Sequence, residues 1–350
     1  MPPSDKLANL LRKAADLKAS DLHIHCGARL RLRINGQLIE KGEAEVTPAA
    51  AESLLAGLLD AEQQQTLAER GQVDFAVDLP GANRARCNMF RQQRGLDAIF
   101  RLIPTEPPTL ESLNLPSTLK TLTEYNNGLV LVCGPAGSGK TSTIAALVSI
   151  VNKEWHDHII TIEDPVEYVH PSRGCIVNQR QVGLHTRSFA AALRAALRED
   201  PDVLMVGELR DLESISLALT AAETGHLVFG TLHTRTTVES ITRIINSFKP
   251  EEQPQVRAQL ADSLRAVISQ RLVLTADKKQ RLPALEILIC NNTIRGLILD
   301  DKTHFIISTQ ELKKDGMCTL DQSLAALSRA GTITSDEARR HCINPDALTR

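Results

Sequence analysis

Long apolar runs are absent from this sequence of 350 residues. No run approaches the roughly 18 residues that a membrane-spanning helix needs. The first residues, Met1 to Lys6, also lack the basic and then apolar pattern of a signal peptide. We therefore expect no transmembrane segment and no secretion leader, and we expect a cytoplasmic protein.

Cysteine is sparse, and neither sign of charge is in excess. The seven cysteines are odd in number and no two form a C-x-x-C pair, which argues against a disulfide framework and a zinc ribbon. We expect reduced, buried thiols. The 40 basic and 42 acidic residues give a formal net charge of -2. This balance does not support a general nucleic-acid binder, so we expect no nucleic-acid partner.

The chain is long enough for two domains, and a proline-rich segment divides it. Residues 103–116 hold four prolines, which neither a helix nor a central strand tolerates. We predict an N-terminal α+β domain over 1–102, a linker over 103–127 that tracks over the surface of one domain, and a second domain over 128–350.

The two predicted domains differ in their patterns. In the first, helices are expected over 5–18 and 48–69, and strands within 22–34, 37–40, 74–79 and 84–102, with turns at Asn35-Gly36, Gly81 and Gly95. In the second, strands at 129–133, 158–163, 203–206 and 227–232 alternate with helices at 139–152, 188–199, 211–223 and 236–247. Such alternation predicts an α/β domain with a parallel sheet covered by helices on both faces. From about 253 onward the sequence predicts mostly helix, with one apolar run at 283–290.

A complete G-x-x-x-x-G-K-[ST] phosphate loop follows the first strand of the second domain. Glycines let backbone N–H groups converge on the β-phosphate, Lys140 can reach the β- and γ-phosphate oxygens, and the Thr141 hydroxyl can ligate Mg²⁺. The sequence therefore predicts a RecA-like P-loop core that binds ATP with Mg²⁺. The expected nucleotide-binding residues are Gly134, Pro135, Ala136, Gly137, Ser138, Gly139, Lys140, Thr141 and Ser142.

Polar residues follow the other strands, and ligands of such sheets bind at the carboxyl ends of the strands. Phosphate hydrolysis needs a carboxylate near Mg²⁺, a water-orienting base and a γ-phosphate sensor. Glu208 suits the metal, Glu163 the water and His233 the γ-phosphate, although a lone Glu163 could equally be a capping residue. His226 and His233 are an odd number of residues apart, so at most one should face the nucleotide, and we favour His233.

Arginines gather in the first domain. The group comprises Arg84, Arg86, Arg91, Arg94 and Arg101, with Asp97 as the acidic residue among them. One interpretation is a solvated basic hairpin. The other is that arginines of one subunit act on the γ-phosphate bound to its neighbour, which requires a ring of subunits.

Three longer blocks resemble the secretion ATPase superfamily, and most closely the type IV pilus retraction ATPases (PilT-like). Residues 161–168, TIEDPVEY, look like the aspartate box of that family. Residues 198–211, REDPDVLMVGELRD, look like its atypical Walker B motif, in which Glu208 replaces the usual aspartate. Residues 224–234, TGHLVFGTLHT, match its histidine box, and the similarity runs from Ser20 to the C-terminal helices.

The resemblance implies a PAS-like N-terminal domain, a RecA-like C-terminal domain and a homohexameric ring. It implies that Glu163 is the general base, that Glu208 serves the Mg²⁺ site, and that Arg86, Arg91 and Arg101 are candidate arginine fingers. It also implies pilin disassembly powered by ATP hydrolysis at the inner face of the inner membrane. The implied partners are a pilus platform protein in that membrane and, as a further possibility, a paralogous pilus ATPase.

Two features bear on the direction of work. Extension ATPases of the superfamily carry a long N-terminal extension and usually a tetracysteine zinc motif, and this sequence shows neither. Retraction ATPases carry an A-I-R-N-L-I-R-E block, and residues 293–300, TIRGLILD, keep its Ile-Arg and Leu-Ile pairs but depart at Gly296, Leu299 and Asp300. Two alternatives stay open: an ATPase of type II secretion or DNA transfer, and a non-hydrolysing regulatory paralogue of a retraction motor.

Overall fold

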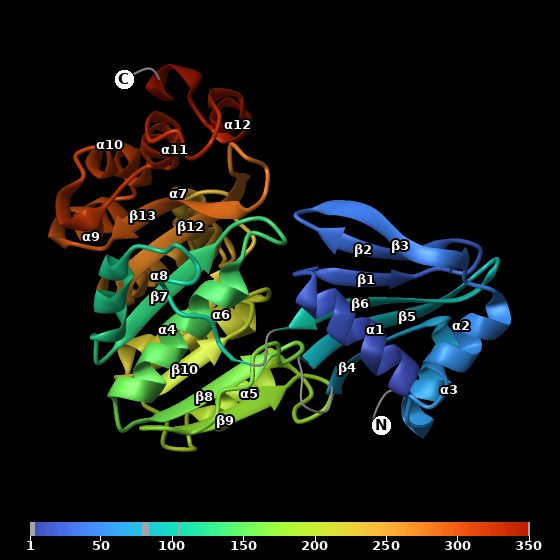
Figure 1. Ribbon diagram of the computed structural model, residues 1–350. Helices are drawn as coiled ribbons and strands as arrows, with labels where there is room; N and C mark the ends of the chain where they lie inside the picture. The colour runs from blue at the N-terminus through green and yellow to red at the C-terminus, as the bar shows by residue number, and fades with distance from the viewer. Residues whose placement is uncertain (1–3, 79–83, 104–105, 349–350) are drawn as a thin grey trace. The chain divides into compact units, whose positions relative to one another are not determined.

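The computed structural model describes residues 4–78, 84–103 and 106–348. The chain forms two compact units: Met1–Glu106 with Glu167–Val169, and Pro107–Val166 with His170–Arg350. Figure 1 shows the elements of both. Leu79, the turn expected at Gly81, and the linker residues Pro104 and Thr105 lie outside the described residues.

The first unit is an antiparallel sheet with helices on one face (Figure 1). The strand order is β3-β2-β1-β6-β5-β4. The strands are β1 (Asp21–Ile24), β2 (Arg29–Ile34), β3 (Gln37–Glu45), β4 (Gln72–Asp78), β5 (Arg84–Gln92) and β6 (Gly95–Ile103). The helices are α1 (Asp5–Asp16), α2 (Pro48–Leu55) and α3 (Ala61–Arg70).

Alternation of residue type decides which face of this sheet is buried. On β5, Ala85, Cys87 and Met89 are buried in the core beneath the helices, while the residues between them are only partly buried. The helical stretch expected over 48–69 forms two helices, α2 and α3. Gly57 lies between them with a φ of 77°, and Asp60 begins α3 with a capping box.

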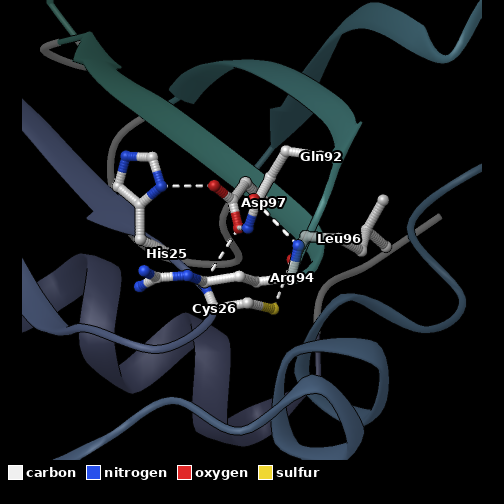
Figure 2. A network of polar contacts seen from close by, with 6 residues as sticks. All are labelled: His25, Cys26, Gln92, Arg94, Leu96 and Asp97. Atoms are coloured by element: carbon white, nitrogen blue, oxygen red, sulfur yellow. Dashed lines mark hydrogen bonds and ion pairs between the residues drawn. The ribbon is translucent and has the colours of Figure 1, made fainter.

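Asp97 anchors the β5–β6 hairpin to the end of β1 (Figure 2). Its carboxylate is fully buried and pairs with the imidazole Nδ1 of His25. Its other oxygen accepts from the Cys26 backbone N–H at 2.8 Å and from the Gln92 side-chain amide at 3.2 Å. Three partners from two segments therefore satisfy one buried carboxylate, which explains how a charge is tolerated there.

The second unit is a mixed sheet of order β13-β12-β7-β11-β10-β8-β9. All neighbours are parallel except β12 and β13, which form an antiparallel pair at one edge. The strands are β7 (Gly128–Cys133), β8 (His158–Glu163), β9 (Ile176–Gln181), β10 (Val203–Val206), β11 (Leu227–Leu232), β12 (Leu264–Leu274) and β13 (Arg281–Ile289).

Both faces of this sheet are covered, as predicted. On β7, Val130 and Val132 pack into one core with α4 (Lys140–Glu154), while Leu129 and Leu131 pack into the other core. The second core is built from α5 (Phe189–Ala196), α6 (Leu212–Glu223), α7 (Thr237–Asn246) and α8 (Gln253–Ser263). Figure 1 shows α4 and α6 flanking the green and yellow strands. Near-continuous apolar strands are what a sheet buried on both faces requires.

Two expectations about the second unit need correction. The prediction of mostly helix from 253 onward is wrong for Leu264–Leu274, which forms β12. An apolar run of this kind fits a buried strand as well as a helix. The described residues of the linker from Pro107 belong to the second unit. Its leucines enter the core beside α4, in part through the 3₁₀ helix η1 (Ser117–Thr123): Leu110, Leu115, Leu119 and Leu122.

Short helices complete the C-terminal region. They are α9 (Asn292–Leu299), α10 (Ile306–Gln310), α11 (Leu320–Arg329) and α12 (Ser335–His341), with 3₁₀ turns η2 (Thr303–Phe305), η3 (Lys314–Gly316) and η4 (Pro345–Leu348). All seven cysteines are unpaired. Within the ranges that the structure describes, no helix has both the length and the apolar character to cross a membrane.

We predict that Asp97→Ala lowers the free energy of unfolding of the first unit by about 1–3 kcal/mol. The reason is that the buried Cys26 N–H and the Gln92 amide lose their acceptor. Denaturant unfolding followed by circular dichroism measures this change. Asp74→Ala, which removes a half-exposed carboxylate from the same sheet, is the control and should cost less than about 0.5 kcal/mol. Equal losses in the two variants would contradict the anchoring role.

Candidate active site

The phosphate loop joins β7 to α4 and leaves the start of the helix open. Gly139 precedes α4 with a φ of 90°, and no side chain caps the helix. N–H groups at the start of a helix are a common binding site for an anion such as a phosphate. Ser138 Oγ is buried and finds no hydrogen-bond partner among the described residues. A buried hydroxyl in this state fits a ligand oxygen better than a purely structural role.

Lys140 folds back onto its own loop. Its ammonium donates to the carbonyl oxygen of Gly134 at 2.9 Å and to that of Pro135 at 3.1 Å. The same nitrogen lies 3.5 Å from Nδ1 of His233. Two neutral carbonyl oxygens thus bind the ammonium at the loop, and phosphate oxygens would be stronger partners for it.

Glu163 ends β8 with a buried carboxylate whose orientation is fixed by neighbours. The Thr161 hydroxyl donates to its Oε1 at 2.7 Å, and the Gln179 side-chain amide donates to the same oxygen at 3.0 Å. Gln179 lies on β9 and itself accepts the backbone N–H of His170 at 2.7 Å. These contacts hold the carboxylate in one position, which is what a general base needs in order to act on one water.

Glu208 follows β10 and pairs with two cationic or potentially cationic side chains. Its Oε2 lies 2.7 Å from Nη2 of Arg210, and its Oε1 lies 3.3 Å from Nε2 of His233. Partial burial alone would raise the pKa of Glu208. The hydrogen bond and charge of Arg210, together with His233, outweigh burial and hold the pKa below its usual value. The carboxylate is thus kept ionised at neutral pH.

The two histidines of the histidine box lie at opposite ends of β11. His233 follows the strand at the edge that carries the phosphate loop, between Lys140 and Glu208. His226 precedes the strand, and its Nδ1 lies 3.0 Å from the carbonyl oxygen of Ala221. The structure therefore brings His233 to Lys140 and Glu208. The sequence favours His233 because it lies at the C-terminal end of this strand, and that is where the structure places it.

The order of the strands explains why these residues meet. β8, β10, β11 and β7 are consecutive neighbours and all run parallel, so Glu163, Glu208, His233 and the phosphate loop follow their carboxyl ends. Gly207 continues this pairing by donating its N–H to the carbonyl oxygen of Ile162 at 2.8 Å. The two glutamates therefore leave neighbouring strands at the same edge.

The donor set at this edge suits Mg²⁺. Thr141 in the first turn of α4 offers a hydroxyl, and Glu208 offers a carboxylate. In nucleotide sites, Mg²⁺ is usually held by one or two protein oxygens together with phosphate oxygens and water. When bound, such an ion would neutralise charge that develops on the phosphates.

The three arginine candidates lie in the first unit, and the structure places two of them side by side. Arg86 and Arg101 are directly opposite each other on β5 and β6, on the face without helices. Nη2 of Arg86 lies 3.8 Å from Asp74, and Nε of Arg101 donates to Asp21 at 3.1 Å. Arg91 is five residues beyond Arg86 on a regular strand, so it points to the other face.

Sequence reasoning missed several residues of the site. Gln179 could not be foreseen as a partner of Glu163, because β9 was not predicted. Arg210 stands two residues after Glu208 within the quoted Walker B block, and its charge was the available signal. Asp97, counted among the arginines, pairs instead with His25, so it does not neutralise the arginine pair of β5 and β6.

Comparison with known proteins gives consistent findings. The family model described as type II/IV secretion system protein matches residues 2–333. A twitching motility protein of Neisseria gonorrhoeae is 44% identical over 319 residues, covering 91% of this chain and 85% of that protein. The type IV pilus retraction ATPase PilT of Pseudomonas aeruginosa is 42% identical over 341 residues, covering 97% and 99%.

A solved structure agrees with these relatives. The crystal structure of the pilus retraction motor PilT with bound ADP has a TM-score of 0.88 and 43% identity, and the match covers 98% of each chain. This likeness over both units confirms the predicted fold class.

We predict that Lys140→Ala abolishes ATP hydrolysis and weakens nucleotide binding, because the loop delivers this one ammonium to the phosphates. A coupled ATPase assay and calorimetric titration with ADP measure the two effects. The variant should remain folded, since the ammonium binds carbonyl oxygens of the loop rather than the apolar cores of the sheet. Full turnover by a folded variant would contradict the assignment.

We also predict that Glu163→Gln binds ATP normally but hydrolyses it at least ~100-fold more slowly, as expected when a general base is removed. Glu208→Gln should instead raise the Mg²⁺ concentration needed for half-maximal turnover. Turnover measured across a Mg²⁺ titration separates the two roles. Normal turnover by Glu163→Gln would mean that another residue is the general base, and Glu167 would be tested next.

Proposed function

The chain belongs to the type II/IV secretion system protein family and is an ATP hydrolase of the pilus retraction type, and on this premise we propose that it works as a homohexameric ring motor. The observation that supports the activity best is the single sheet edge that carries the phosphate loop, Glu163, Glu208 and His233. Domain movements driven by hydrolysis would power pilin disassembly.

In this proposal each residue has a distinct task. The N–H groups of the phosphate loop and Lys140 bind the β- and γ-phosphates of ATP. Glu163, held by Thr161 and Gln179, orients and deprotonates the attacking water. His233, between Lys140 and Glu208, contacts the γ-phosphate and responds to its loss.

Arg86 and Arg101 act on the nucleotide of a neighbouring subunit. Their opposed positions on β5 and β6 support joint action, because two guanidinium groups from adjacent strands can grip one phosphate group. Their carboxylate partners, Asp74 and Asp21, pre-orient them. Arg91 lies on the opposite face and is not part of this proposed pair.

The proposed setting is the cytoplasmic side of the inner membrane. A platform protein of the pilus would receive the movement of the ring, and a paralogous ATPase could share the task. The alternative of a non-hydrolysing regulator is separated from the motor by turnover: the purified chain should hydrolyse ATP in the presence of Mg²⁺. Deleting the gene should leave excess pili that do not retract.

Action in trans predicts complementation between two inactive proteins. Lys140→Ala subunits keep their arginines, and Arg101→Ala subunits keep their nucleotide site. Mixed rings would join intact sites to intact arginines and should recover part of the ATPase activity that each protein lacks, since a trans arginine can be worth several powers of ten in rate. Native mass measurement must confirm mixed hexamers.

A matched control uses Arg70, an exposed arginine at the end of α3 on the helical side of the same unit. Arg70→Ala alone should keep its activity. The recovered activity should also disappear on dilution that separates the subunits. Mixed hexamers that stay inactive would refute the action of Arg101 in trans.

A further inference from the structure

Gln270 lies on β12 directly beyond the end of β7. The two strands pair in parallel as far as Ser269 and Cys133, and β12 then continues while the chain of β7 turns into the phosphate loop. Gln270 is therefore the first residue of β12 to stand beside the loop. Its side chain is buried, with 4% of the residue exposed.

Gln270 contacts both glycines that bound the loop. A Cβ atom placed on Gly134 would lie 2.4 Å from the backbone oxygen of Gln270, and one placed on Gly139 would lie 2.8 Å from its side-chain Nε2. Both distances are below any normal contact, so backbone and amide pack directly against the glycines. One residue of a neighbouring strand thus touches the start and the end of the loop.

The same side chain is bonded to the first turn of α4. The Thr143 hydroxyl donates to Oε1 of Gln270 at 2.7 Å, and Thr143 is fully buried. Thr143 also donates its backbone N–H to the carbonyl oxygen of Gly139 at 3.0 Å. The amide therefore joins the last glycine of the loop to the helix that follows it.

A buried amide at this position needs hydrogen-bond partners, and Thr143 supplies one. β12 is otherwise largely apolar at its buried positions, and burying an amide costs free energy that an apolar side chain of the same size avoids. We propose that Gln270 is a positioning residue for nucleotide binding. It holds Gly139 and the start of α4 so that their N–H groups point to the phosphates, through its bond to Thr143.

This inference rests on the phosphate loop being the nucleotide site, and the test separates the two. The experiment measures ADP affinity by calorimetry and ATP turnover for the full chain with Gln270→Met, which keeps the volume of the side chain but loses its hydrogen bond. Thr143→Val removes the hydroxyl of the partner at similar volume, and Thr143→Ser keeps it. Lys140→Ala is the reference for the site itself.

Gln270→Met and Thr143→Val should each weaken ADP binding about tenfold, the effect of one lost hydrogen bond. The double variant should also lose about tenfold rather than a hundredfold, because both changes break the same bond. Thr143→Ser should stay within about twofold of the native affinity. In Gln270→Met, the KM for ATP should rise by a larger factor than kcat falls. The reason is that the lost bond misaligns the loop mainly before nucleotide binds.

Gln310→Met is the matched control for burial. Gln310 is fully buried on α10, where its amide donates to the carbonyl oxygen of Ile287 at 3.3 Å. It should lower the melting temperature without changing ADP affinity. The proposal is overturned if Gln270→Met affects ADP no more than Gln310→Met, or if the double variant loses a hundredfold. If Gln270→Met does not fold, the ADP affinities of Thr143→Val and Thr143→Ser decide. Native ADP binding by Lys140→Ala would overturn the phosphate-loop assignment instead.

Discussion

Parallel pairing of four strands is the constraint on which the candidate site depends. β7, β11, β10 and β8 run in one direction as consecutive neighbours, so whatever follows their last residues is delivered to one edge. Lys140 and His233, which are 93 positions apart in the chain, meet there because the strands that precede them pair side by side. The apolar cores on both faces of the sheet stabilise the pairing, and the polar residues at the edge contribute little to it.

Charges at that edge are arranged in a chain of neighbours. Lys140 lies beside His233, His233 beside Glu208, and Glu208 beside Arg210, with each step between 2.7 and 3.5 Å. A nucleotide that recruits Lys140, or an ion that recruits Glu208, must alter the next contact in the chain. This chain of contacts runs from the phosphate loop to the exposed side chain of Arg210.

Much of this site could be predicted from sequence, because phosphate loops and strand ends carry short local signals. Lys140, Glu163, Glu208 and His233 are such residues, and the structure places His233 in contact with both Lys140 and Glu208. Contacts that come from non-local pairing could not be predicted. Gln179 depends on β9, whose half-buried pattern is weak, and β12 was taken for helix because an apolar run has no decisive period.

Gly207, directly before Glu208, lies where two strand ends pack closely. A Cβ atom there would lie 3.2 Å from the carbonyl oxygen of Ile162 and 3.3 Å from Cα of Glu163, so glycine lets the ends of β8 and β10 approach closely. The usual aspartate of a Walker B strand is replaced by Glu208, one residue further along. From this position the carboxylate of Glu208 contacts both His233 and Arg210. The Walker B segment of this chain thus combines a glycine that fits between two closely packed strands with a carboxylate that contacts both His233 and Arg210.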